Sequence, residues 1–194
     1  MGKVRRDIGR LSVPGDRWTT KRRLHTANPK ATALHNKRVG EVVHAYNTAQ
    51  SSFFQLFLIV VGDGKSELAE KIWNSQGTDH GRRNLLRLYT ANTIRRKLIR
   101  KSIIWSISAM DQLSQHRNDA VHADMIWYYD HLTPGWLPDK KRRNRMESFP
   151  LEKIWIKLRG DFAAIANYVN DLNLTIWMGE SRPLSKRPKL QLVR

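Results

Sequence analysis

The sequence predicts an all-α protein, a bundle of about five helices around one long central helix, with basic, flexible tails at both ends. Three observations support this prediction. Apolar residues recur at three- and four-residue spacing through several long segments, and no segment shows a reliable strand-like alternation. Neither Gly nor Pro interrupts the chain from Arg82 to Leu132. An apolar fraction of 40% with 7 Trp is typical of a globular protein.

The first half of the chain contains three predicted helices. Residues 33–61 carry a continuous apolar stripe, and Gly62 and Gly64 then end the helix. A short helix follows over about residues 66–74. A third helix over about residues 80–91 begins after Thr78 or Asp79, either of which can cap it.

The long fourth helix is predicted from about Thr93 to Asp124, with an extension to His131 left open. Its segment from Ile103 to Met110 is apolar on more than one face, which indicates a position in the centre of a bundle or at a subunit interface. Pro and Gly residues make 133–150 a loop. The last helix begins at about Leu151 and ends before Gly179.

These elements divide the chain into a basic arm (residues 1–33), a helical domain (34–180) and a basic tail (181–194). Of the formal charge of +18, much is in the ends, because residues 1–38 carry 11 Lys and Arg against 2 acids and residues 181–194 carry 5 against none. Basic tails suit a polyanionic partner, RNA foremost, through phosphate contacts. The alternative is that these ends are simply solvated, because basic tails contact phosphates and do not by themselves recognise a nucleotide sequence.

Composition also excludes several classes of protein. The chain has no cysteine, which rules out disulfides, thiolate zinc sites and a thiol nucleophile. The longest apolar run, residues 53–61, is too short to span a membrane. No signal peptide is recognisable before residue 38. We therefore expect a cytoplasmic protein without a membrane association and without a cofactor.

The segment richest in chemistry follows the apolar part of the long helix and reads Arg117-Asn118-Asp119-Ala120-Val121-His122. Such strongly hydrogen-bonding groups beside apolar residues need partners or a substrate. The alternative to a catalytic role is an ion-paired cluster in which Asp111, Asp119 or Asp124 neutralises Arg117. A second Arg-to-His pair, Arg38 and His44, lacks the amide, because Val39 follows its arginine.

An Arg, four to six residues and a His, with Asn directly after the Arg, near the end of a long helix in an all-α chain, resembles the motif of the HEPN domain family. The resemblance in helix order covers residues 39–178, and its specific part is the six residues Arg117 to His122. It implies a metal-independent endoribonuclease whose cleft is shared by two protomers of a homodimer. It further implies a toxin or defence role, in which an antitoxin or other regulator remains unidentified.

The chemistry expected of such a site is cleavage of RNA by its own 2′-hydroxyl. His122 would take the hydroxyl proton, Arg117 would stabilise charge on the phosphoryl oxygens, and Asn118 would orient one or the other. The product would carry a 2′,3′-cyclic phosphate, and DNA would not be cleaved. A metal site built from His122, His131 and nearby aspartates is the less favoured option, because its spacing matches no ligand motif.

Further basic residues are candidate nucleic-acid contacts, and solvation is the alternative for each group. Two lie near the start of the third helix, two precede the long helix, and five lie in the loop beside several aromatic residues that could stack on bases. They are Arg82, Arg83, Arg95, Arg96, Lys140, Lys141, Arg142, Arg143 and Arg145. The main rival function is a non-catalytic RNA-binding protein, and another is a regulatory bundle whose Arg-Asn-His cluster is structural.

Overall fold

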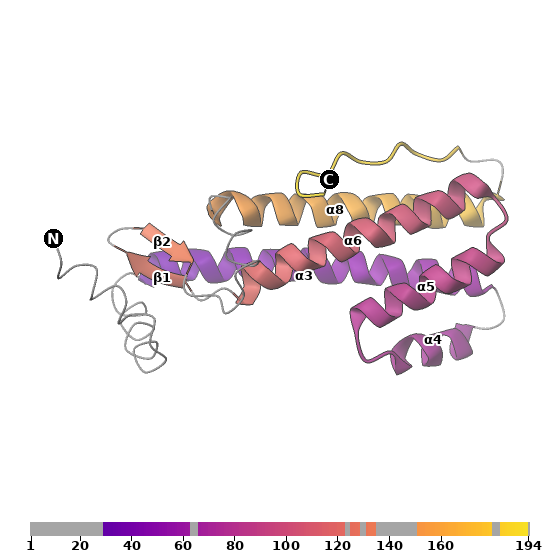
Figure 1. Ribbon diagram of the computed structural model, residues 1–194, viewed down its shortest axis with the longest axis horizontal. Helices are drawn as coiled ribbons and strands as arrows, with labels where there is room; N and C mark the ends of the chain where they lie inside the picture. The colour runs from indigo at the N-terminus through magenta and orange to yellow at the C-terminus, as the bar shows by residue number, and fades with distance from the viewer. Residues whose placement is uncertain are drawn as a thin grey trace, which may run out of the picture. The chain divides into compact units, whose positions relative to one another are not determined.

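The computed structural model of the chain describes residues 29–62, 66–122, 125–128, 131–134, 151–179 and 183–193, and for some of these it describes only the backbone. Five helices account for most of the described part, which confirms the predicted all-α class (Figure 1). They are α3 (Pro29–Val61), α4 (Ser66–Ser75), α5 (Asp79–Thr93), α6 (Lys97–His122) and α8 (Leu151–Trp177).

Local signals set several helix ends close to where the sequence predicted them, but two starts differ. The helix α3 begins at Pro29 rather than at about residue 33, and α6 begins at Lys97 rather than at about Thr93. The Thr78 hydroxyl caps α5 by accepting a hydrogen bond from the backbone N–H of Gly81 at 3.0 Å. Gly62 (φ 98°) and Gly179 (φ 70°) follow the ends of α3 and α8 in the left-handed conformation that glycine adopts without a Cβ clash. Residues 94–96 separate α5 from α6.

The chain divides into two compact units. One comprises residues 42–117 and 157–194, and the other comprises residues 1–41 and 118–156. In the second unit, two short strands, β1 (Met125–Tyr128) and β2 (His131–Pro134), pair antiparallel, with Tyr128 opposite His131. The open extension of the long helix to His131 is therefore wrong, because this segment forms a hairpin instead. Of the predicted arm at residues 1–33, residues 29–33 belong to α3, and residues 1–28 lie outside the described residues.

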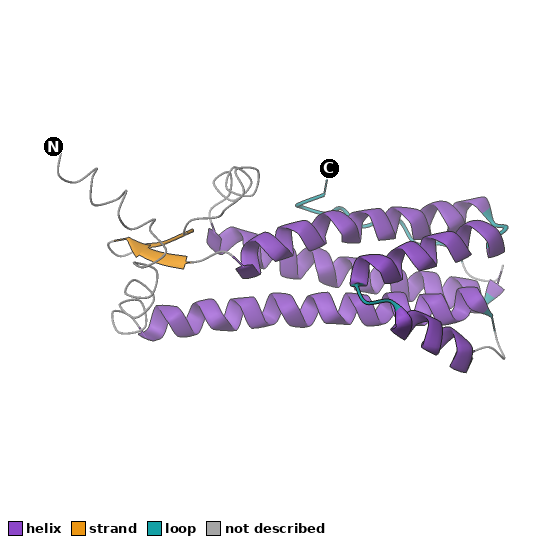
Figure 2. Cartoon of the chain, turned by 60° about the horizontal axis from the view of Figure 1, so that its bottom comes forward, coloured by secondary structure: helices purple, strands orange, loops and turns teal. Residues whose placement is uncertain are grey.

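The first unit is a helix bundle (Figure 2). Aromatic side chains join its elements. Phe57 of α3 packs on Trp73 of α4 at 5.1 Å and against the ring of Tyr89 of α5 at 5.4 Å. Trp105 of α6 meets the edge of Tyr168 of α8 at 5.5 Å. The largest fully buried side chains come from α3, α5, α6 and α8, and include Phe53, Leu86, Ile103, Ile107, Met110, Phe162 and Ile165.

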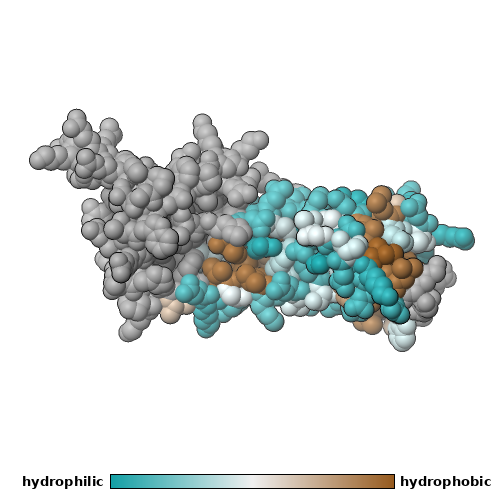
Figure 3. All heavy atoms as spheres, turned by 90° about the horizontal axis from the view of Figure 1, so that it is seen from below, coloured by the Kyte–Doolittle hydropathy of each residue, from teal (hydrophilic) through white to brown (hydrophobic). Residues whose placement is uncertain are grey.

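Burial inside this unit explains why α6 is apolar on more than one face. Ile103, Ile107 and Met110 are fully buried, and Trp105 is covered in part by Tyr168. Of the two positions predicted for this helix, the centre of a bundle is the one observed. Seen from below, the described surface is mostly hydrophilic, with separate apolar patches (Figure 3). No helix in the described ranges is both long and apolar enough to cross a membrane.

Residues 183–193 run back along α8 (Figure 1). The buried carboxylate of Asp161 on α8 accepts the backbone N–H groups of Gln191 and Leu192, each at 2.9 Å at its closest. Leu192 is itself buried, and the Arg187 guanidinium lies 5.4 Å from the centre of the Trp105 ring. We call residues 183–193 the C-terminal strap. Its packed state differs from the flexible tail that we expected there.

The strap should depend on Asp161. In Asp161→Ala, two backbone N–H groups lose their acceptor, so we expect a loss of about 1–3 kcal/mol in the free energy of unfolding. Trypsin should also cleave faster after Lys186 and Lys189, as followed by mass spectrometry. Glu70→Ala on the exposed surface of α4 is the control. An unchanged cleavage rate in Asp161→Ala would show that the carboxylate does not hold the strap.

The same carboxylate predicts a pH dependence. Burial raises the pKa of the Asp161 carboxyl above its ordinary value, against the opposing effect of the hydrogen bonds from Gln191 and Leu192. The folded state thus binds a proton more readily than the unfolded chain, and the resulting stability is lost as pH rises through the folded-state pKa. Measured by urea denaturation, the stability of the wild type minus that of Asp161→Asn should fall from about pH 4 to about pH 7. A difference that grows with pH would contradict this sign.

Candidate functional site

The three residues of the Arg-Asn-His motif all lie in the last two turns of α6. Arg117 belongs to the helix-bundle unit and is half-buried, and Asn118, the first residue assigned to the other unit, is also half-buried. The backbone of His122 ends the helix, but its side chain lies outside the described residues. The structure thus fixes the surroundings of Arg117 and leaves its geometry with His122 as a prediction.

Arg117 lies over an aromatic ring. Its guanidinium carbon is 4.1 Å from the centre of the Tyr46 ring on α3, which is the geometry of a cation–π contact. Its Nε is buried and has no hydrogen-bond partner in the described part of the chain. Among the residues that the structure describes, no carboxylate pairs with Arg117. The contact therefore fixes one face of the guanidinium without neutralising its charge.

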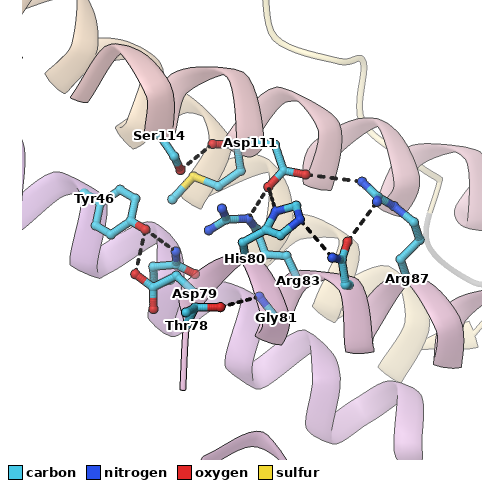
Figure 4. A network of polar contacts seen from close by, with 12 residues as sticks. Tyr46, Thr78, Asp79, His80, Gly81, Arg83, Arg87, Asp111 and Ser114 are labelled. Carbon is cyan, nitrogen blue, oxygen red and sulfur yellow. Dashed lines mark hydrogen bonds and ion pairs between the residues drawn. The ribbon is translucent and has the colours of Figure 1, made fainter. Parts of the chain in front are cut away.

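Tyr46 is itself held in place from three sides. Its hydroxyl donates a hydrogen bond of 2.7 Å to Oδ2 of Asp79 in the first turn of α5 and accepts one of 2.7 Å from Gln50 (Figure 4). Phe162 of α8 meets its ring edge-on at 5.4 Å. The ring is 4% exposed. Such a ring has little freedom to turn, so it holds the guanidinium in a defined position.

A second polar cluster surrounds Asp111 on the α5–α6 face (Figure 4). The Asp111 carboxylate accepts Nε of Arg83 at 2.8 Å and Nη2 of Arg87 at 3.3 Å, and it lies 3.2 Å from Nδ1 of His80. Asn84 bridges His80 and Arg87. Asp111 is thus committed to α5, which removes the alternative in which it neutralises Arg117. The side chains of Asp119 and Asp124, the other proposed partners, lie outside the described residues.

Arg83 was predicted to contact nucleic acid, and the structure corrects this. Its side chain is 3% exposed and is bound to Asp111, so it is not accessible to a phosphate. Arg82 is half-buried and pairs with Asp79 at 3.2 Å. Both arginines that were predicted to contact nucleic acid at the start of α5 therefore form ion pairs within the fold.

The remaining predicted contacts fall into two groups. Arg95 and Arg96 are exposed in the turn before α6, and Nη1 of Arg96 donates to the carbonyl of Gly179 at 3.2 Å. The five loop residues, Lys140, Lys141, Arg142, Arg143 and Arg145, lie outside the described residues. So do the side chain of His131 and the aspartates of the disfavoured metal site. In the part of the chain that is described, no group of three His, Cys, Asp or Glu side chains is arranged to hold a metal ion.

The second Arg-to-His pair differs from the first in its surroundings. His44 is an exposed side chain on α3, as expected for a surface histidine. Like Arg117 and His122, the two residues of this pair belong to different units, and the feature that separates the pairs is Val39, which stands where the motif favours an amide.

Sequence reasoning missed two residues that shape this region, Tyr46 and Asp79. It named Asp111, but as a partner of the wrong arginine. One signal was available for Asp111, because it is the only acidic residue from Arg95 to Asn118 and the preceding helix offers three arginines. No comparable signal pointed to Tyr46, whose contact with Arg117 joins positions 71 residues apart.

The ion pair between Asp111 and Arg83 should be the most sensitive polar contact of the bundle. Asp111→Ala leaves a buried guanidinium without its carboxylate, for which we expect a loss of about 3–5 kcal/mol in the free energy of unfolding. Arg87→Ala removes a partly exposed contact and should cost less than about 1 kcal/mol. Adding Arg83→Met to Asp111→Leu should recover stability relative to Asp111→Leu alone. Urea denaturation of the four variants tests this, and equal losses for Asp111→Ala and Arg87→Ala would refute it.

Comparison with known proteins does not place the chain in a family. A scan against family models finds no match, and searches among curated proteins and solved structures find no significant similarity. The resemblance to the HEPN domain therefore still rests on the Arg117–His122 motif and on the order of the helices.

Proposed function

We propose that this protein is a metal-independent endoribonuclease, in which His122 deprotonates the 2′-hydroxyl of a ribose. Arg117 stabilises the negative charge that builds on the adjacent phosphoryl oxygens, and Asn118 orients His122 or the phosphate. The nucleophile is the hydroxyl of the substrate itself, so the chemistry requires neither a metal ion nor a protein nucleophile. The 2′-oxygen forms a bond to phosphorus while the P–O5′ bond breaks, and the leaving 5′-oxygen takes a proton from solvent, to which His122 returns the proton that it removed.

The observation that carries the proposal is the state of Arg117. A buried arginine that serves only to stabilise a fold normally forms an ion pair with a carboxylate, as Arg83 does with Asp111. Arg117 instead lies on the face of Tyr46, and none of the described carboxylates pairs with it. A guanidinium held by an aromatic ring keeps its charge and most of its N–H donors for another anion. A phosphate group can accept two parallel hydrogen bonds from such a guanidinium.

Helix geometry supports a cleft shared by two chains. Asn118 and His122 are four residues apart and share one face of α6, whereas Arg117 is about 140° around the helix axis from His122. One helix therefore does not aim the arginine and the histidine in the same direction. A two-fold arrangement would bring the pair from a second chain into the same cleft, which is what the HEPN resemblance implies. The apolar residues of α6 lend no further support to a dimer, because the chain buries them itself.

A non-catalytic RNA-binding protein is the second candidate. It is favoured by the exposed basic side chains around the start of α6, which need no catalytic group to hold RNA. In this alternative, or in one where the motif is structural, Arg117 stacks on Tyr46 for stability alone. The HEPN resemblance extends the nuclease proposal further. We propose that the protein acts in the cytoplasm in a toxin or defence role, and that an antitoxin or other regulator controls it.

The test is cleavage of RNA by the purified chain in EDTA. We expect His122→Ala to reduce the rate by about 10²–10⁴-fold, which is the range for loss of a general base. Arg117→Ala should also lose most activity, since the charge on the phosphoryl oxygens loses its partner. His44→Ala changes an exposed histidine elsewhere and should cleave at the wild-type rate.

Thermal melts of the same variants separate chemistry from folding. His122→Ala should melt like the wild type, whereas Arg117→Ala should lose about 0.5–2 kcal/mol through its contact with Tyr46. Full activity in His122→Ala, or a requirement for a divalent metal ion, would exclude the mechanism. RNA binding without cleavage in the wild type would favour the second candidate.

A further inference from the structure

Five basic side chains form a collar around the start of α6. The basic collar comprises Arg95, Arg96, Lys97, Arg100 and Lys101, and all five are exposed. No ion pair joins any of them to a carboxylate of the described residues, and the first turn of α6 contains no acidic residue. This contrasts with the arginines of α5, which neighbouring aspartates neutralise. The positive charge of the collar is therefore available to an external anion.

An exposed tryptophan lies next to this collar. Trp177, the last residue of α8, is 75% exposed, which is unusual for so large an apolar side chain. The hydrogen bond from Arg96 to the carbonyl of Gly179, two residues after Trp177, places the collar beside the end of α8. Leu98 in the first turn of α6 is 72% exposed, and Met178 is 47% exposed. An aromatic surface and unpaired cations thus occur together at one end of the bundle unit.

We infer that Trp177 and the basic collar form a binding site for single-stranded RNA, in which a base stacks on the indole ring and the collar contacts phosphates. Stacking on an exposed aromatic ring requires an unpaired base, and such sites tolerate many sequences. The assignment of RNA rather than single-stranded DNA rests on the proposed nuclease function. Lys97 and Arg117 are 20 positions apart on α6, which corresponds to about 30 Å. The site is therefore separate from the proposed catalytic residues.

RNA fits this surface better than a second copy of the chain does. A symmetric contact through Trp177 would bring two collars close together, and their like charges would repel. An anionic membrane surface shares the charge preference, and the test below distinguishes it. RNA supplies both partners that the site needs, a flat base for the ring and closely spaced phosphates for the five cations.

The experiment measures binding of a fluorescently labelled single-stranded RNA of about 20 nucleotides to the full chain carrying His122→Ala, which prevents the proposed cleavage. Adding Trp177→Ala should weaken binding at least about fivefold, and adding Trp177→Phe should retain most of the affinity because it keeps a ring. Replacing Arg95 and Lys101 by Gln should reduce the slope of log affinity against log salt concentration by an amount that corresponds to about two phosphate contacts. Leu68→Ala, an exposed apolar residue on α4, is the matched control and should bind normally.

Each outcome decides the assignment. Unchanged RNA affinity in Trp177→Ala would overturn it. A membrane site would be indicated instead if the chain binds phosphatidylserine vesicles and Trp177→Ala abolishes that binding while RNA binding persists. A dimer contact would be indicated instead if Trp177→Ala changes the chain from dimer to monomer without changing its RNA affinity. A failure of the proposed nuclease function can be distinguished from a failure of this binding site. If the wild type binds RNA through Trp177 but does not cleave it, the nuclease proposal fails and this site stands.

Discussion

The carboxylate of Asp111 is the contact on which the polar architecture of the bundle depends. It neutralises Arg83, whose side chain is almost fully buried, and so joins α5 to α6 through charge as well as through apolar packing. A buried guanidinium without this partner would be strongly unfavourable. With α5 fixed, Asp79 in its first turn is in position to hold the hydroxyl of Tyr46. The ring of Tyr46 then supports Arg117, so a structural ion pair and a candidate catalytic group belong to one connected network.

The arginines of the bundle unit are used in two different ways. Those of α5 are paired with aspartates and serve the fold, with exposure that decreases from Arg87 to Arg83. Arg117 and the basic collar have no such carboxylate among the described residues and keep their charge for other partners. Net charge alone does not make this distinction, because each of these side chains adds one positive charge whether or not it is paired. The distinction identifies which cations are available to an anionic substrate.

The helices were predictable because their signals are local. Apolar spacing, the Thr78 cap and the glycines after α3 and α8 each act within a few residues. The hairpin of β1 and β2 was not predictable, because its strands are only four residues long and Tyr129-Asp130 between them is not a recognised hairpin-turn sequence. The burial of Arg83 and the docking of the C-terminal strap on Asp161 depend on contacts between distant segments, which periodicity does not encode. For the candidate site, the sequence supplied the residue types and their helix, whereas only the structure supplied the stack on Tyr46.

The central claim is that Arg117 and His122 promote attack of a ribose 2′-hydroxyl on its own 3′-phosphate, which breaks the P–O5′ bond to the next nucleotide. The most direct measurement uses a DNA oligonucleotide that contains a single ribonucleotide, incubated with the wild-type chain in EDTA and examined by mass spectrometry. We predict one cut, directly 3′ of the ribose, with a 2′,3′-cyclic phosphate on the 5′ fragment. Cuts at deoxyribose positions, or a cut that leaves a 3′-hydroxyl and a 5′-phosphate, would contradict the claim.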